Sequence, residues 1–352
     1  MKKFLIFTLT VVMLFTFGTI MAFATETAEE TTNVAKIGDV EYSTFEEALA
    51  EANATSSNSP YIVLLQDITL NETMNVTGSG GHVVLDLNGF NVVSNQETAI
   101  EVTGNFGIIN QGANDGSIVT TAESGTVINV QSTGMVSIFK TGADIIVGNG
   151  TGTALNSAGM FCVITGGTYL GKVSIVVSMF TNVTGGTYSE DPSAFMKSGY
   201  VTEKNSEGLY AIEQQVTESQ IFTYKGYSVN SESAGVVVTY TINHDKLDAY
   251  ERQNDVTVDF GAVFAIEAID ENAVEYSLSS YADTTTYNIK INEISEDNYT
   301  TALIMTMYVD FGEGKQYITG DDSNATVFVD ATSVVAITYN QANQATSTEE
   351  EE

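Results

Sequence analysis

The sequence predicts an all-β protein: a short right-handed parallel β-helix with an N-terminal capping helix, followed by an antiparallel β-sandwich domain. Three observations indicate this fold. Short β-rich runs repeat between Thr98 and Tyr188, runs after Val216 alternate apolar and polar residues, and helical spacing of apolar residues is confined to short segments. Because one core seldom serves a chain of 352 residues, two domains are expected.

Residues 1–24 have the features of a secretory signal peptide. Lys2 and Lys3 precede an apolar run that ends in the small-x-small sequence Ala22-Phe23-Ala24. An uncleaved membrane anchor is the alternative, since the run is long enough to span a bilayer. We expect cleavage, because threonines dilute the run and the small-x-small site follows directly. The mature protein is then extracellular, free or held non-covalently at the cell surface, with a flexible lead-in at residues 25–35 and no membrane contact.

Residues 36–214 are expected to form the capped β-helix. The helix predicted over Ser43–Ala52 begins with a capping box, in which a hydroxyl residue is followed three residues later by Glu46. The end of a β-helix is an open sheet edge, and this helix is placed to cover the first one. Runs at Tyr200–Glu203 and Gly208–Ile212 predict a hairpin that closes the other end.

Two repeated motifs indicate the coils. Thr98–Glu101, Thr126–Asn129 and Thr153–Asn156 share one pattern, and Gly166–Tyr169 returns as Gly185–Tyr188. A parallel sheet without intervening helices must coil around itself, with each coil stacked about 4.8 Å from the last. Equivalent residues of the repeats should therefore form columns along the stack.

Side-chain alternation along each strand assigns the columns to the inside or the outside. Ile100, Ile128 and Leu155 are expected to form an aliphatic column inside. Their neighbours then point outward, where they offer hydrogen-bonding groups to a neutral polymer or are simply solvated: Glu101, Asn129 and Asn156.

Tyr169 and Tyr188, one coil apart, should stack on the same face. Two aromatic rings in line can bind sugar rings. The alternative, which the absence of tryptophan favours, is a ladder that only stabilises adjacent coils. The candidate ligand-binding residues are thus Tyr169, Tyr188, Glu101, Asn129 and Asn156.

A third repeat contains the only cysteine, Cys162, which cannot form an intramolecular disulfide. Alignment of Met135–Ser137, Met160–Cys162 and Met179–Thr181 places it in a column with Ser137 and Thr181. A small packed side chain is expected there in preference to a nucleophile, because no histidine lies nearby in the sequence.

Residues 216–340 are expected to form the β-sandwich, with one helix at Asn243–Gln253 capped by Asn243, and residues 341–352 an acidic disordered tail. The predicted strand runs are Phe222–Ser228, Gly235–Ile242, Val256–Ala268, Thr286–Ile294, Thr301–Phe311 and Thr326–Tyr339.

The coil region resembles a known family at both ends. Ala35–Asp39 and Leu85–Gly89 resemble a recurrent opening of secreted pectin-lyase-like β-helix proteins of Gram-positive, often gut, bacteria. Gly185–Ser193 resembles the sequence that closes those helices. The resemblance covers residues 35–213 and implies the β-helix architecture and an exported surface protein, in many members a non-catalytic one. Residues Phe222–Thr300 are similar to a β domain found in the same class of proteins.

The formal charge of −33, from 12 basic and 45 acidic residues, disfavours nucleic-acid and membrane-surface partners. No cofactor or metal is predicted. Asp321–Asn324 could hold calcium, but it lacks the ligand spacing of an EF-hand loop and is typical of a plain turn. His82 and His244 are expected to be solvated or partly packed side chains.

Pectate lyases and polygalacturonases share the fold that the resemblance implies, and they use basic residues or paired aspartates. Here Arg252 lies outside the coils, and only Lys140 and Lys172 fall within them. We therefore expect an exported, non-catalytic binding or adhesion protein with a glycan or another surface protein as partner. A polysaccharide lyase or glycoside hydrolase, and a purely structural surface protein, are the alternatives.

Overall fold

The computed structural model describes residues 33–55, 59–78, 81–230, 233–279, 284–320 and 326–342. The predicted signal peptide and the Asp321–Asn324 turn lie outside these ranges, as do most of the lead-in and of the acidic tail. Within them, no helix is both long and apolar enough to span a bilayer.

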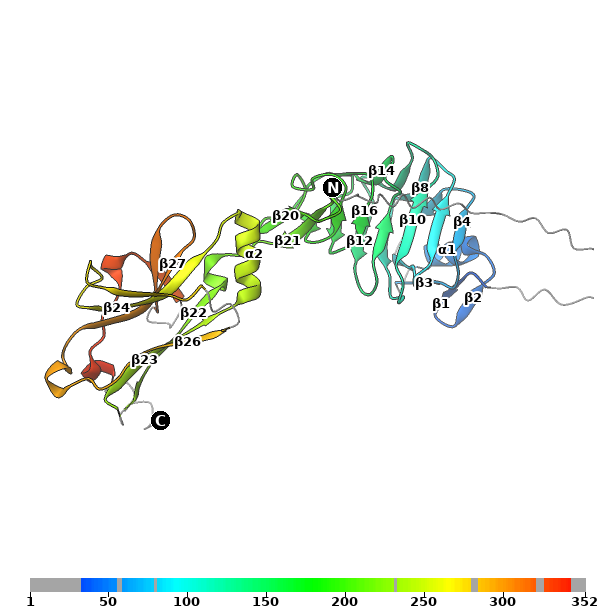
Figure 1. The fold of residues 1–352 in the computed structure, drawn as a ribbon. Coiled ribbons are helices and arrows are strands. Elements are labelled where there is room, and N and C mark those ends of the chain that lie inside the picture. Colours follow the sequence, from blue (N-terminus) through cyan, green and yellow to red (C-terminus); the bar gives the residue numbers. More distant parts are fainter. Residues whose placement is uncertain are drawn as a thin grey trace, which may run out of the picture.

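The first half of the described chain is a three-sided parallel β-solenoid (Figure 1). Sheet A contains β3 (Tyr61–Leu64), β6 (His82–Asp86), β9 (Asn105–Ile109), β12 (Met135–Phe139), β15 (Phe161–Ile164) and β18 (Phe180–Val183). Sheet B contains β4 (Ile68–Leu70), β7 (Asn91–Ser94), β10 (Gly116–Thr120), β13 (Ile145–Val147), β16 (Thr168–Tyr169) and β19 (Thr187–Tyr188). Sheet C contains β5 (Met74–Val76), β8 (Thr98–Val102), β11 (Thr126–Val130), β14 (Thr153–Ser157) and β17 (Lys172–Ile175).

The predicted columns of sheet C are confirmed by its register. Ile128 pairs with Ile100 on one side and with Leu155 on the other, and all three side chains are fully buried. Asn129 pairs in the same way with Glu101 and Asn156, which therefore share the outer face. The predicted all-β class, with its parallel β-helix, is thus confirmed.

Polar side chains bridge the coils at their corners. Asn110 is fully buried, and its carboxamide donates to the carbonyls of Asn114 (3.0 Å) and Asp144 (2.8 Å) and accepts from the amide of Gly89 (2.8 Å). Since a buried amide or carbonyl without a partner costs free energy, one asparagine satisfies backbone groups of three successive coils.

The N-terminal end of the solenoid is covered as predicted, with the helix shifted along the chain. Helix α1 (Phe45–Ala54) packs against β1 (Ala35–Ile37), β2 (Val40–Tyr42) and β3, and buries Phe45, Ala48 and Ala52. Its N-cap is Thr44, which accepts from the Glu47 amide, and not Ser43. Near its C-terminal end, Asn53 bonds the carbonyl of Asn75 and the amide of Thr77, on and just after the edge strand β5.

The other end is closed by the predicted hairpin. Strands β20 (Tyr200–Lys204) and β21 (Tyr210–Gln214) pair antiparallel, and β21 continues sheet B beside β19. The hairpin ends the parallel stack and leads directly to the second half of the chain.

The second half contains two antiparallel sheets with their own hydrophobic core. Sheet D has the order β22 (Phe222–Asn230), β23 (Gly235–Ile242), β26 (Thr286–Ile291). Sheet E has the order β25 (Val274–Ser277), β24 (Asp259–Ile266), β27 (Leu303–Asp310), β28 (Lys315–Gly320), β29 (Thr326–Val329). The connections include α2 (His244–Asn254) and the short 3-10 helices η1 (Glu218–Gln220), η2 (Glu296–Asn298) and η3 (Ala331–Ser333).

The sandwich-like arrangement and the helix α2 with Asn243 as its N-cap are confirmed. Residues 339–342 are helical, and Ala342 is fully buried in the sandwich core, so the part of the predicted tail that is described belongs to the domain.

One arginine joins the two halves. Arg252, on α2, donates to the carboxylate of Glu203 on β20 and, at 2.8 Å, to that of Glu213 on β21. Beside it, Gln253 accepts from the Val216 amide and donates to the Gln214 carbonyl. These bonds raise the pKa of the Arg252 guanidinium further, so the bridge persists at any physiological pH.

Replacing Ile128 by alanine should lower the free energy of unfolding by about 2–5 kcal/mol, because it leaves a cavity between Ile100 and Leu155. The exposed turn variant Ser132→Ala is the control and should stay within about 0.5 kcal/mol of the parent. Urea unfolding followed by circular dichroism measures both, and equal midpoints would contradict the buried column.

Arg252→Gln should loosen the junction between the solenoid and the sandwich. The two exposed ion pairs contribute about 0.2–1 kcal/mol each, so we expect limited proteolysis at residues 214–217 to accelerate about two- to fivefold. Lys246→Gln, on the same helix and with the same change in charge, is the control. Unchanged cleavage in Arg252→Gln would show that the bridge does not hold the junction.

Candidate functional site

The two tyrosines proposed as a sugar-stacking pair lie inside the solenoid. The Tyr169 and Tyr188 rings are stacked, with centroids 4.8 Å apart and planes 9° from parallel, and are 0% and 1% exposed. Their hydroxyls donate to the carbonyls of Gly166 and Gly185. Neither ring face is open to a ligand, so the prediction of a sugar-binding role is wrong here and the ladder alternative describes them.

The Gly-Gly corner explains why this motif repeats. Gly167 and Gly186 have φ values of 95° and 104°, a backbone conformation that residues with a side chain rarely adopt. A Cβ at Gly186 would also lie 2.9 Å from the Tyr188 hydroxyl. The glycines therefore leave room for each tyrosine ring to pack against the corner that precedes it in the chain. Burial of the rings raises the pKa of both phenols.

The polar column on sheet C is a hydrogen-bonded ladder. Asn129 donates to Glu101 and Asn156 donates to Asn129, both at 2.8 Å, and Gln131 also donates to Glu101. The outward orientation is confirmed, whereas a ligand-binding role stays a prediction. Because these groups bond mainly to one another, few of their polar atoms are left for a ligand.

Sheet A carries an exposed apolar surface near the hairpin end of the solenoid. Met135, Phe161 and Phe180 are in register on β12, β15 and β18, on the outer face, and are 41%, 36% and 51% exposed. Four more exposed apolar residues lie in the adjoining corners. Together these seven residues are called the apolar strip: Met135, Met160, Phe161, Val176, Val177, Met179 and Phe180.

A small apolar cavity of about 250 Å³ adjoins the apolar strip, lined by Met135, Phe161, Phe106 and His82 among others. Next to it, Gly107 leaves room for the His82 ring, since a Cβ at Gly107 would lie 2.7 Å from His82 Nε2. His82 Nε2 lies 3.3 Å from Ser137 Oγ, and burial lowers the pKa of the imidazole, which is neutral at pH 7. These two residues resemble a nucleophile and base in spacing. Ser137 lines the cavity but is only 3% exposed, and its hydroxyl also lies 3.4 Å from the Phe106 carbonyl oxygen.

The predicted column of Cys162 is correct for Thr181 and wrong by one residue for Ser137. Cys162 pairs with Val136 and Thr181, whereas Ser137 pairs with Val163 and points to the other face. The corner before β15 is one residue shorter than that before β12, so alignment of the Met residues misplaces the register. Burial raises the pKa of the Cys162 thiol to about 12.

The basic residues considered for catalysis are dispersed. Lys140 forms an ion pair with Asp144 at 3.7 Å, and Arg252 belongs to the domain junction. Within the described ranges, no group of three or more His, Cys, Asp or Glu side chains is placed to hold a metal ion.

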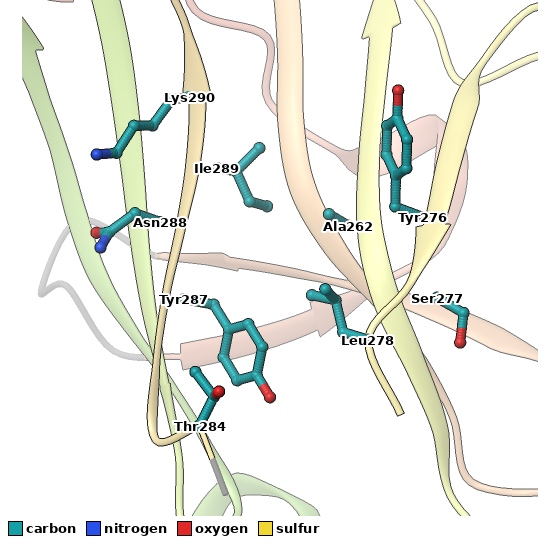
Figure 2. A pocket seen from close by; sticks show the side chains of 9 residues that line it. All are labelled: Ala262, Tyr276, Ser277, Leu278, Thr284, Tyr287, Asn288, Ile289 and Lys290. Carbon is teal, nitrogen blue, oxygen red and sulfur yellow. The ribbon is translucent and has the colours of Figure 1, made fainter. Parts of the chain in front are cut away.

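A cavity of about 510 Å³ lies in the sandwich. It separates β25 from β26, the neighbouring edge strands of sheets E and D. Figure 2 shows Ile289 and Tyr287 from one side, and Leu278 and Tyr276 from the other, around this space. Sequence analysis missed this site because it did not predict β25.

Comparisons of the chain with protein-family models, with curated proteins and with solved structures found no match. The fold therefore defines the class: a capped parallel β-solenoid joined to an antiparallel, sandwich-like domain.

Cys162 should react with Ellman's reagent only when the protein unfolds, because its thiol is buried and its pKa is raised to about 12. In buffer at pH 8 we expect less than about a tenth of a thiol per chain to react within minutes, and close to one in concentrated guanidinium chloride. Rapid labelling of the folded protein would contradict the interior position of Cys162.

Proposed function

We propose that the protein is an exported, non-catalytic adhesion protein that binds another protein through the apolar strip. The observation that supports this is the row of Met135, Phe161 and Phe180, which are exposed in register on a regular sheet. Soluble proteins rarely expose a contiguous apolar patch without a partner. Methionine side chains adapt to the shape of a bound surface, which suits a protein partner.

A glycan is the less favoured partner. The two features that suggested sugar binding are a buried tyrosine pair and a polar ladder bonded to itself. Phe161 and Phe180 lie on neighbouring strands and could stack on a sugar, but the strip around them consists of methionine and valine, which do not pair with hydroxyl groups.

Export and surface location rest on the sequence of residues 1–24, and the pectin-lyase-like, Gram-positive kinship rests on the motifs at Ala35–Asp39, Leu85–Gly89 and Gly185–Ser193. The parallel solenoid is compatible with both. The formal charge of −33 would steer the protein towards a partner with a basic rim around its apolar contact surface.

The double variant Phe161→Ser/Phe180→Ser should lose binding to protein targets on an array that carries extracellular proteins and glycans. Val335→Ser, which removes an exposed apolar side chain (68%) from the sandwich, is the matched control and should bind like the parent. We expect a loss of at least about tenfold in affinity.

If the parent bound only glycans on the array, the partner would be a carbohydrate and not a protein, which would contradict the proposal. The proposed role of the apolar strip would be contradicted if the parent bound neither proteins nor glycans on the array, or if the double variant bound as tightly as the parent.

A further inference from the structure

The two sheets of the C-terminal domain are unequal. Within the described residues, sheet D has three strands and sheet E has five, and β22 packs over β28 and β29 while β26 packs over β27. Strands β24 and β25 therefore extend past the edge of sheet D on the side of β26. The cavity between β25 and β26 lies where a further strand of sheet D would be.

Side-chain exposure agrees with an uncovered inner face. Tyr276 and Val274 of β25 pair with Ala262 and Phe264 of β24, which places them on the face that sheet E turns towards sheet D. On that face, the central residues Met307 and Val309 are fully buried, whereas Tyr276 is 62% and Val274 is 44% exposed. A second cavity, of about 250 Å³, continues the first along Val274, Phe264 and Ile291.

The groove also has a strand edge open for pairing. Strand β26 pairs with β23 on one side only, in the described part of the chain, so it is an edge strand of sheet D and its other edge faces the cavity. Inward side chains Ile289 and Ile291 alternate with outward Asn288 and Lys290, as Figure 2 shows for three of them. An added strand would gain main-chain bonds from the edge and apolar contacts from the floor.

Charge indicates the composition of that strand. The ion pairs formed within the described ranges involve Lys140, Arg252 and Lys315, so Lys290 is an exposed cation outside them. Residues opposite one another on adjacent strands interact, so the position beside Lys290 favours Asp or Glu. The chain's own terminal stretches are poor candidates, because residues 25–32 and 343–352 are acidic but have no alternating large apolar residues.

We propose that this groove binds an extended segment of a partner polypeptide, which adds to the β26 edge as a fourth strand of sheet D. The segment has apolar residues at alternate positions over Ala262, Val274 and Tyr276, and an acidic residue beside Lys290. The groove is separate from the apolar strip and goes beyond the proposed adhesive role.

The test selects from a display library of random peptides of about ten residues, enough for one strand, on the full-length mature protein. We expect enriched peptides with alternating apolar residues and an intervening Asp or Glu. In fluorescence anisotropy, Lys290→Glu and Tyr276→Ser should each weaken a selected peptide at least about tenfold, since each removes one of the two recognition features. Lys246→Glu and the Phe161→Ser/Phe180→Ser variant are the controls and should bind it normally.

Two further measurements identify the mode of binding. Exchange of the acidic residue of the peptide for lysine should restore binding to Lys290→Glu, and N-methylation of alternate amides should abolish binding if main-chain pairing holds the peptide. The proposal is overturned if no peptide is enriched over the double variant Lys290→Glu/Tyr276→Ser, or if N-methylated peptides bind equally. It is also overturned if sedimentation shows that a second copy of the chain occupies the groove in the parent and not in that double variant.

Discussion

The parallel hydrogen-bond ladder between successive coils is the constraint on which the solenoid depends. It fixes the register between strands, so each side chain stacks on an equivalent one above and below. Aliphatic side chains therefore meet in the interior, as Ile100, Ile128 and Leu155 do. Tyrosine rings meet tyrosine rings, and amides bond to amides along the column. Equivalent positions in neighbouring coils therefore have the same surroundings, which explains why the sequence repeats from coil to coil.

The same register also aligns the outward side chains in columns, and these columns differ between sheets C and A. On sheet C the outward Glu101, Asn129 and Asn156 side chains bond to one another along the column. On sheet A the outward column changes from His82 and Asn105 to Met135, Phe161 and Phe180 towards the hairpin end, and its apolar side chains remain in solvent. Burial of these residues against another surface is favourable, which is the physical basis of the proposed adhesive role.

The two domains also differ in how far their sheet edges are covered. The solenoid ends are covered by α1 and by the β20–β21 hairpin, while β25 and β26 leave an apolar groove between two sheet edges in the sandwich. The Arg252 ion pairs attach the sandwich directly to the β20–β21 hairpin, which closes the C-terminal end of the solenoid. The open groove and the apolar strip thus belong to different domains of one molecule.

Local and repeated patterns were readable from the sequence, because the forces behind them act between residues near in the chain or equivalent in the repeat. These patterns determined the fold class, the sheet C columns, the closing hairpin and the Asn243 cap. Tertiary structure alone decided which repeated aromatic faces solvent. A corner one residue shorter moved Phe161 to the outside and Cys162 beside Val136, and the Gly-Gly corners turned Tyr169 and Tyr188 inward. It also decided the existence of the groove, since β25 is short and the packing of sheet D against sheet E is set by contacts between residues far apart in the chain.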